Sequence, residues 1–111
     1  MPADVVFNIV LLREGHVLAT PSAVSAFGRE VSVEIDYVAR VTAVAHAPND
    51  EGRSVTTVTM EVFDGKQWLP SEEMSMPAKL SMTPSFEYSV PGTAYRFVIM
   101  PRRVVVSVSE K

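Results

Sequence analysis

The chain has 111 residues, contains no cysteine and carries a formal net charge of −3, from ten Lys and Arg against thirteen Asp and Glu. This length suits one domain with one core, residues 1–111, and a hydrophobic fraction of 47% excludes a wholly disordered chain. Without cysteine, neither disulfides nor thiolate metal and redox chemistry are available. Basic residues are dispersed and no apolar stretch could span a bilayer, so we predict no direct nucleic-acid binding and no membrane insertion.

The first predicted element, residues 5–12, is apolar on both alternation phases. Its first phase contains Val5, Phe7, Ile9 and Leu11, and its second contains Val6, Val10 and Leu12. It is short and follows Asp4 rather than a basic residue, which argues against a secretory signal and favours a protein made in the cytoplasm. Two interpretations remain open for residues 1–12: a central strand between two layers, or an arm that pairs with a neighbouring molecule.

The next segments contain one candidate helical turn and two strands. Residues 22–27 could form a helical turn, confined by Pro21 and Gly28. Residues 31–37 alternate cleanly between apolar and polar side chains, which predicts a strand with one buried face. Residues 40–47 continue as a second strand, and the polar cluster 48–52 predicts a mobile hairpin tip.

A tight hairpin is predicted at Asp64-Gly65. The strand before it, residues 57–62, alternates in period two, and Asp-Gly suits a type I′ turn, which needs positive φ at two residues. Residues 66–69 would then be the returning strand, and they contain Trp68, the only tryptophan.

Four more strands are expected in the last third of the chain. Residues 74–82 alternate strictly, and Pro77 predicts that this strand lies at a sheet edge or carries a bulge. Residues 86–90 and 95–99 repeat the alternation, Pro101 interrupts it, and residues 104–108 would form the last strand. About eight to nine short strands with frequent turns predict an all-β fold, an antiparallel β-sandwich or jelly roll.

No constellation of residues points to catalysis. The five glycines do not form a phosphate loop, and no nucleophile-elbow motif surrounds a serine. His16 and His46 are thirty residues apart without further metal ligands, so we interpret both as strand-end surface residues. Glu34 and Asp36 lie on the same face of a predicted strand, and we interpret this face as solvent-exposed rather than as a catalytic pair of carboxylates. We therefore predict no enzyme, no catalytic residue, no metal and no cofactor.

Other residues are better candidates for packing or for an interface. Trp68 is expected to pack beside its hairpin or to lie in an interface, because tryptophan is usually largely buried. Methionines on the predicted edge strand would suit a surface that adapts to a partner. The candidate interface residues are Val6, Val10, Leu12, Met74, Met76, Arg102 and Arg103.

The segment 58–70, V-T-M-E-V-F-D-G-K-Q-W-L-P, is followed by V-P-G-T-A-Y-R-F-V-I at residues 90–99 and by a valine-rich end. Over residues 58–108, about half of the chain, this resembles small β-sandwich phage virion proteins, in particular capsid decoration or staple proteins of short-tailed bacteriophages. The resemblance implies that Asp64 and Gly65 form the hairpin, that Trp68 packs behind it and that Tyr95 belongs to a core strand.

The resemblance also implies a function. Such a protein is not an enzyme, binds the major capsid protein on the outer surface of the virion, often as a homodimer, and clamps neighbouring capsid subunits. The alternative is a carbohydrate-binding module, for which Trp68, Tyr88 and Tyr95 would be stacking residues. Against it, Tyr88 and Tyr95 fall on alternation phases that predict core-facing side chains.

Overall fold

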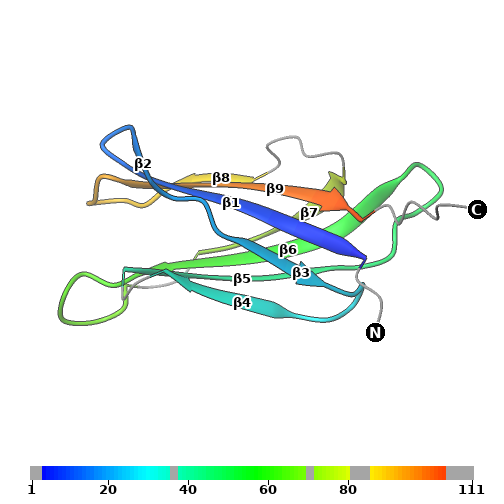
Figure 1. Cartoon of the computed structure of the whole chain (residues 1–111), viewed down its shortest axis with the longest axis horizontal. Coiled ribbons are helices and arrows are strands. Elements are labelled where there is room, and N and C mark those ends of the chain that lie inside the picture. Colours follow the sequence, from blue (N-terminus) through cyan, green and yellow to red (C-terminus); the bar gives the residue numbers. More distant parts are fainter. Residues whose placement is uncertain (1–3, 36–37, 70–71, 81–85, 105–111) are drawn as a thin grey trace, which may run out of the picture.

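The computed structural model describes residues 4–35, 38–69, 72–80 and 86–104, and these form two antiparallel sheets (Figure 1). Within these residues there is no helix, and hence none that could cross a membrane. The nine strands are β1 (Val5–Arg13), β2 (His16–Ala19), β3 (Ser22–Ser25), β4 (Val31–Ile35), β5 (Ala39–Ala45), β6 (Arg53–Val62), β7 (Glu72–Lys79), β8 (Phe86–Ser89) and β9 (Tyr95–Arg103). The predicted all-β sandwich of eight to nine strands is confirmed.

Sheet A has the strand order β2-β1-β9-β8, with β3 also paired to β1. Its centre is the long β1–β9 ladder, which runs from Val5 opposite Arg103 to Arg13 opposite Tyr95. The other edge of β1 pairs with two short strands in turn, β2 and then β3, and Pro21 lies between these two strands. Proline has no N–H to give to a ladder, but the Pro21 carbonyl still accepts the N–H of Ile9 at 2.9 Å. Strand β1 is therefore paired on both edges within its own chain.

Sheet B is a meander of four consecutive strands, in the order β4-β5-β6-β7. Each strand pairs with the next one along the chain, so the register is set between segments that are close in sequence. Between β5 and β6 the Asn49 side chain accepts the N–H groups of Glu51 and Arg53, at 2.9 and 3.0 Å. Strand β7 lies at the sheet edge, as Pro77 predicted.

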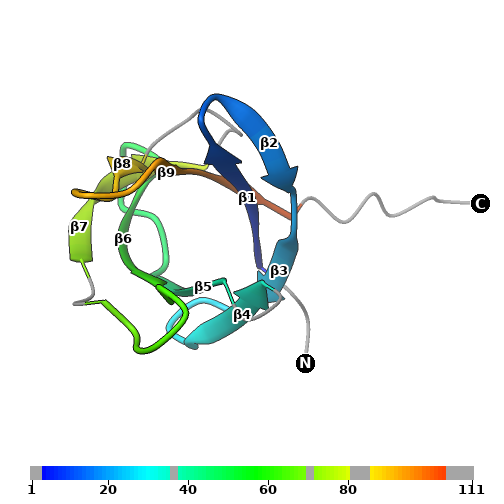
Figure 2. The ribbon, with the colours of Figure 1, turned by 90° about the vertical axis from the view of Figure 1, so that its left-hand side faces the viewer.

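One hydrophobic core fills the space between the sheets. Alternate residues of each strand point inward, as the period of two requires. Sheet A contributes Phe7, Ile9, Leu11, Phe86, Phe97 and Ile99, and sheet B contributes Val41, Val58, Met60 and Val62, all at most 2% exposed. At one corner of the sandwich β3 lies beside β4 (Figure 2). At another, the Arg103 N–H of β9 donates to the Leu80 carbonyl, just after β7, at 3.1 Å.

The predicted helical turn at residues 22–27 is wrong, because residues 22–25 form strand β3. Ala23 and Ser25 are buried while Ser22 and Val24 are exposed, which is strand alternation. The free edge of β1 supplies a hydrogen-bonding partner that a one-turn helix lacks, and tertiary pairing overrides a weak local preference. Beyond β3, the Asp4 carboxylate accepts the N–H of Phe27 at 2.9 Å.

The tight hairpin at Asp64-Gly65 differs from the prediction. Gly65 has φ of 99°, but Asp64 does not have a positive φ, so the two residues do not form a type I′ turn. The predicted returning strand at residues 66–69 is reduced to an isolated bridge between Phe63 and Trp68, and the ladder with β6 resumes in β7. A type I′ signature occurs instead at Glu14 and Gly15, with φ of 53° and 80°, between β1 and β2.

The strand containing Tyr95 continues past the predicted interruption at Pro101, which is a buried residue of β9 opposite Phe7. Proline is tolerated here because β8 pairs with β9 only from Arg96 to Ile99, so the described residues leave the outer side of β9 unpaired at Pro101. Of the predicted last strand, only Val104 is described, and residues 105–108 lie outside the described part of the chain. The same holds for residues 36–37 of the second predicted strand.

Candidate functional site

The outward face of sheet A carries apolar side chains on three neighbouring strand positions, with Asn8 of β1 and Ser22 of β3 between them. Residues opposite one another in an antiparallel ladder share a face, so the register identifies which side chains lie together. Val10 lies opposite Val98, Leu12 opposite Val17, and Val6 opposite Val24. With Met100, which follows Val98 on the same face of β9, they form what we call the apolar face: Val6, Val10, Leu12, Val17, Val24, Val98 and Met100.

The apolar face is partly open to solvent. Val17 is 59% and Val24 is 55% exposed, and Leu18, at the bulge between β1 and β2, is 50% exposed. Val10, Leu12, Val98 and Met100 are half-buried by their neighbours. Charged residues lie at both ends of the face: Arg96, opposite Leu12, forms an ion pair with Glu87 of β8, and Arg102 lies opposite Val6. Exposed apolar side chains with polar residues around them are typical of an interaction surface.

The outward face of sheet B is different in kind. Its outward positions are mainly polar: Ser32, Glu34, Arg40, Thr42, Thr57, Thr59, Glu61, Glu73 and Ser75. Many are hydrogen-bonded along the face, for example Ser32 to Thr42 at 3.1 Å and Thr57 to Ser75 at 3.0 Å. The two outer surfaces of the sandwich are therefore suited to different surroundings, sheet B to water and sheet A to another apolar surface.

The residues proposed from the sequence as interface residues fall into separate groups. Val6, Val10 and Leu12 all lie in the apolar face, although Val6 is only 9% exposed. Arg102 lies opposite Val6 at one end of this face, and the guanidinium of Arg103 lies 5.7 Å from the ring of Phe27. On β7 in sheet B, the 39% exposed Met76 lies apart from these, and Met74 packs against the core.

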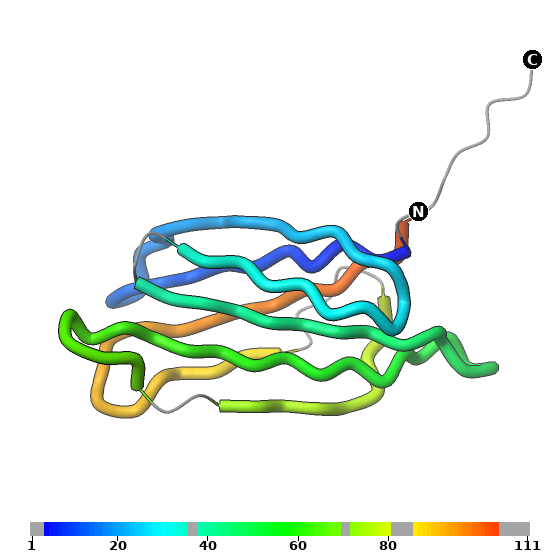
Figure 3. The backbone as a smooth tube through the Cα atoms, turned by 90° about the horizontal axis from the view of Figure 1, so that it is seen from below, coloured from blue at the N-terminus to red at the C-terminus, as the bar shows by residue number. Residues whose placement is uncertain are grey.

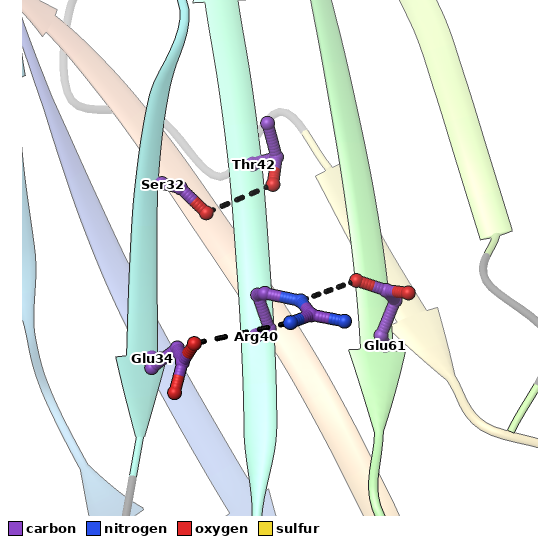
Figure 4. A network of polar contacts seen from close by, with 5 residues as sticks. All are labelled: Ser32, Glu34, Arg40, Thr42 and Glu61. Carbon is purple, nitrogen blue, oxygen red and sulfur yellow. Dashed lines mark hydrogen bonds and ion pairs between the residues drawn. The ribbon is translucent and has the colours of Figure 1, made fainter. Parts of the chain in front are cut away.

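Trp68 packs on the outside of sheet B rather than between the sheets. The Arg40 guanidinium lies 4.2 Å from the centre of the indole ring, and the ring of Phe63 is 5.4 Å away. Arg40 is held in turn by Glu61, at 2.7 Å, and by Glu34, at 3.8 Å, so the network crosses three strands (Figure 4). The hydrogen bond to Glu61 raises the pKa of Arg40. Trp68 is thus a half-buried residue that fixes the loop after β6 to the sheet.

Replacing Trp68 with alanine should lower the free energy of unfolding by about 1–2 kcal/mol. The variant loses a cation–π contact and part of an apolar contact, but not a fully buried ring. Urea unfolding followed by circular dichroism measures this, and Trp68→Phe, which keeps a ring over Arg40, should recover about half of the loss. A decrease of the size seen for a core aromatic residue would contradict this position of the ring.

Asp64 organises the loop after β6 through its carboxylate. Oδ1 accepts the backbone N–H groups of Lys66 at 2.8 Å and Gln67 at 2.9 Å, and the Asp64 N–H donates to the Gln67 carbonyl at 3.0 Å. These hydrogen bonds, first that of Gln67 and then that of Lys66, favour the ionised carboxylate and lower the pKa of Asp64.

The lowered pKa of Asp64 predicts a pH dependence of stability. A carboxyl group whose pKa is lower in the folded chain than in the unfolded chain, about 3.9, stabilises the fold at higher pH. That contribution is lost as the pH falls below about 4 towards the folded pKa. Unfolding of the wild type and of Asp64→Asn should therefore differ most near neutral pH, and the difference should shrink in acid. A difference between the two proteins that stayed constant from neutral pH to pH 3 would contradict this role of the carboxylate.

The turn between β1 and β2, the turn between β8 and β9 and the loop after β6 lie at the same end of the sandwich (Figure 3). A cleft is lined by residues of these segments. Its volume is about 570 Å³. The lining residues are Arg13, Glu14, Val38, Val62, Phe63, Asp64, Gly65, Thr93, Ala94 and Tyr95. Its size and its mixture of apolar and charged walls are those of a small ligand or side-chain site.

The aromatic residues considered for carbohydrate stacking are largely engaged in packing. Tyr88 and Tyr95 are partly buried and pack against the core, as their alternation phase predicted. The guanidinium of Arg13 lies 5.7 Å from the centre of the Tyr95 ring, and Arg40 covers Trp68. No open row of three aromatic rings results from this arrangement.

The sequence predicted three of the seven residues of the apolar face and missed the other four. Val98 and Met100 could have been found, because they make β9 apolar on both phases, as Val10 and Leu12 do for β1. Val17 and Val24 could not, because β2 and β3 are only four residues long and show too few alternations. The Glu14-Gly15 turn was also missed, since Glu rarely occupies a position with positive φ.

Within the described residues, no group of three or more His, Asp or Glu side chains is placed to hold a metal ion. His16 and His46 are exposed at strand ends, which confirms their interpretation as surface residues. Comparison of the chain with protein-family models, with curated proteins and with solved structures gave no match in any of the three.

Proposed function

We propose that this chain is a non-enzymatic structural protein that binds the outer surface of a phage capsid and clamps neighbouring subunits of the major capsid protein. The observation that carries the proposal is the contrast between the two outer surfaces of the sandwich. Sheet A presents an apolar face that the fold does not need for its own core, whereas sheet B presents a polar, hydrogen-bonded face. The resemblance over residues 58–108 supports the phage virion as the setting.

The apolar face has the dimensions of a protein-binding surface. β1 and β9 are nine residues long, which corresponds to roughly 30 Å, and the three strand positions of the apolar face span roughly 14 Å. This area is of the same order as the roughly 800 Å² that each partner contributes to a standard interface. Flat, β-branched side chains also suit packing against another sheet or a broad protein surface.

A clamp must contact more than one subunit, so the proposal includes a homodimer. When one copy of a dimer is bound to the repeating shell, the second copy is held at a high effective concentration beside its own site. Two moderate contacts then give a high overall affinity. The pairing of two copies would use a second surface, and the edge strand β7 offers one. On its outward side Pro77 lies opposite Val55, which is 51% exposed.

Co-sedimentation with capsids that lack the protein tests the proposal. Saturable binding with a copy number related to icosahedral symmetry is the expected result, and sedimentation equilibrium of the free protein should give twice the 12.2 kDa chain mass. Absence of binding at micromolar protein concentration would overturn the capsid assignment.

A further inference from the structure

The most exposed side chains of the apolar face lie on the two short strands beside β1. Val17 is 59% and Val24 is 55% exposed, whereas the residues of the face on β9 are half-buried. Val17 lies opposite Leu12 and Val24 lies opposite Val6, so the two rows are roughly 20 Å apart along β1. The face therefore offers apolar contacts at both ends of a narrow stripe.

The apolar face is too small for two copies of this chain to pair stably through it. It measures roughly 30 by 14 Å and covers roughly 400 Å², about half of the area that each partner contributes to a standard interface. Two copies packed face to face would bury less than the roughly 1,200 Å² that marks the lower limit for stable complexes. The face is therefore better matched to a single narrow element than to a second sandwich.

The margin of the face towards β8 is unfavourable for a broad partner. The ion pair between Arg96 and Glu87 lies there, with both side chains 49% exposed. A partner sheet of four strands is roughly 19 Å wide and would cover this pair, and removing an ion pair from water is costly. An α-helix with its side chains is only about 10–12 Å across. A helix along β1 therefore fits the stripe and leaves the ion pair in water.

The end of the face that contains Val6 and Val24 carries an arginine whose charge is not paired within the described residues. Arg102 lies opposite Val6, is exposed and forms no ion pair there. The Asp4 carboxylate at this end already accepts the N–H of Phe27 at 2.9 Å. The C-terminal end of a helix is negative, and a cation beside it is stabilising. A helix on this face is therefore favoured with its C-terminus at Arg102.

We infer that the apolar face binds one amphipathic α-helix of a partner protein, about four turns long, which lies along β1 with its C-terminal end at Arg102. Four turns extend about 22 Å, which matches the separation of the two exposed rows. Residues i, i+4, i+7, i+11 and i+14 of such a helix share one face and contact these rows. The identity of the partner as a major capsid protein rests on the proposed function, whereas the shape and direction of the helix rest on the face itself.

A titration of the full chain with synthetic peptides, followed by NMR amide shifts, tests this site without a capsid. The probe is a hydrocarbon-stapled helix of about 16 residues, with leucine at the five positions given above and two glutamates in its last turn. We expect saturable shifts at residues 6–12, 17–19 and 22–24. A matched stapled helix with two lysines in its last turn should bind about tenfold more weakly, because the lysines repel Arg102.

Charge reversal on the protein separates binding from structure. Arg102→Glu should weaken binding of the glutamate helix about tenfold and strengthen binding of the lysine helix, an exchange that a general loss of structure does not produce. Arg53→Glu replaces an exposed arginine at the start of β6 in sheet B. It is the matched control and should leave both affinities unchanged.

A third peptide, with leucine and threonine in strict alternation, represents a β-strand partner. Equal or tighter binding of this peptide, no saturable shift at millimolar concentration, or the same effect of Arg102→Glu on both helices would overturn the inference. Saturable binding of the glutamate helix by a protein that does not co-sediment with capsids would support the helix site and overturn the capsid assignment instead.

Discussion

Replacing Phe97 with alanine is expected to lower the free energy of unfolding by about 3–5 kcal/mol, the usual cost of removing a buried aromatic side chain. Phe97 is 0% exposed and lies on β9 between Leu11 of β1 and Tyr88 of β8. The lost ring leaves a cavity at the centre of sheet A that neighbouring strands cannot close without breaking their ladders. Urea unfolding at neutral pH measures the change.

Two further variants make the Phe97 result interpretable. Phe97→Leu keeps an apolar side chain of smaller volume and should cost less, so it reports on packing even where the alanine variant does not fold. Arg96→Ala, at the neighbouring exposed position, loses a surface ion pair with Glu87 and should change stability by less than about 1 kcal/mol. A loss for Phe97→Ala as small as that for Arg96→Ala would contradict the placement of this ring in the core.

If the proposed function holds, introducing aspartate at Val10 should reduce binding to the capsid by about a hundredfold or more. Val10 lies at the middle of the apolar face, opposite Val98, so a partner that covers the face would bury an unpaired carboxylate. The free protein should remain folded, at a cost of about 1 kcal/mol, because the side chain is only half-buried and points away from the core. Co-sedimentation with capsids measures the binding.

Val44→Asp is the matched control for Val10→Asp. Val44 is also a half-buried valine that points outward from a long central strand, but it lies on β5 in sheet B. Its replacement should have a similar effect on stability and none on binding. If Val44→Asp abolished binding and Val10→Asp did not, sheet B would be the binding surface and the assignment of the apolar face would be wrong.

The alternation of side chains was sufficient to predict the fold class and the core-facing phase of most strands. In residues 31–35 and 57–62 one phase is apolar and the other polar, so only one orientation buries the apolar side chains. Residues 5–12 offered no such contrast, because both phases are apolar. Which of these two phases faces the core is decided by the pairing of β1 with β9. This pairing joins segments far apart in the sequence, so the local pattern could not predict it.

Turn geometry was less accessible from the sequence. Asp-Gly after residues 57–62 indicated a reversal of the chain, and the chain does turn there, but the Asp64 carboxylate binds Lys66 and Gln67 and builds a wider loop. Glu14-Gly15 lacks the usual residue pair of a type I′ turn, yet the register of β1 with β2 imposes that geometry. The cleft could not be foreseen at all, since its walls come from three turns that meet only in the folded chain.

The long ladder between β1 and β9 sets the order in which this protein can fold. Sheet B consists of consecutive hairpins, so it can form while the rest of the chain is still being synthesised. Sheet A cannot, because its central pair joins residues 5–13 to residues 95–103, and closing so large a loop makes such contacts slow to form. Until then the inner face of the meander stays exposed. Folding on the ribosome should therefore pass through a stage with an uncovered apolar surface, in which chaperone binding or aggregation competes with completion of the sandwich.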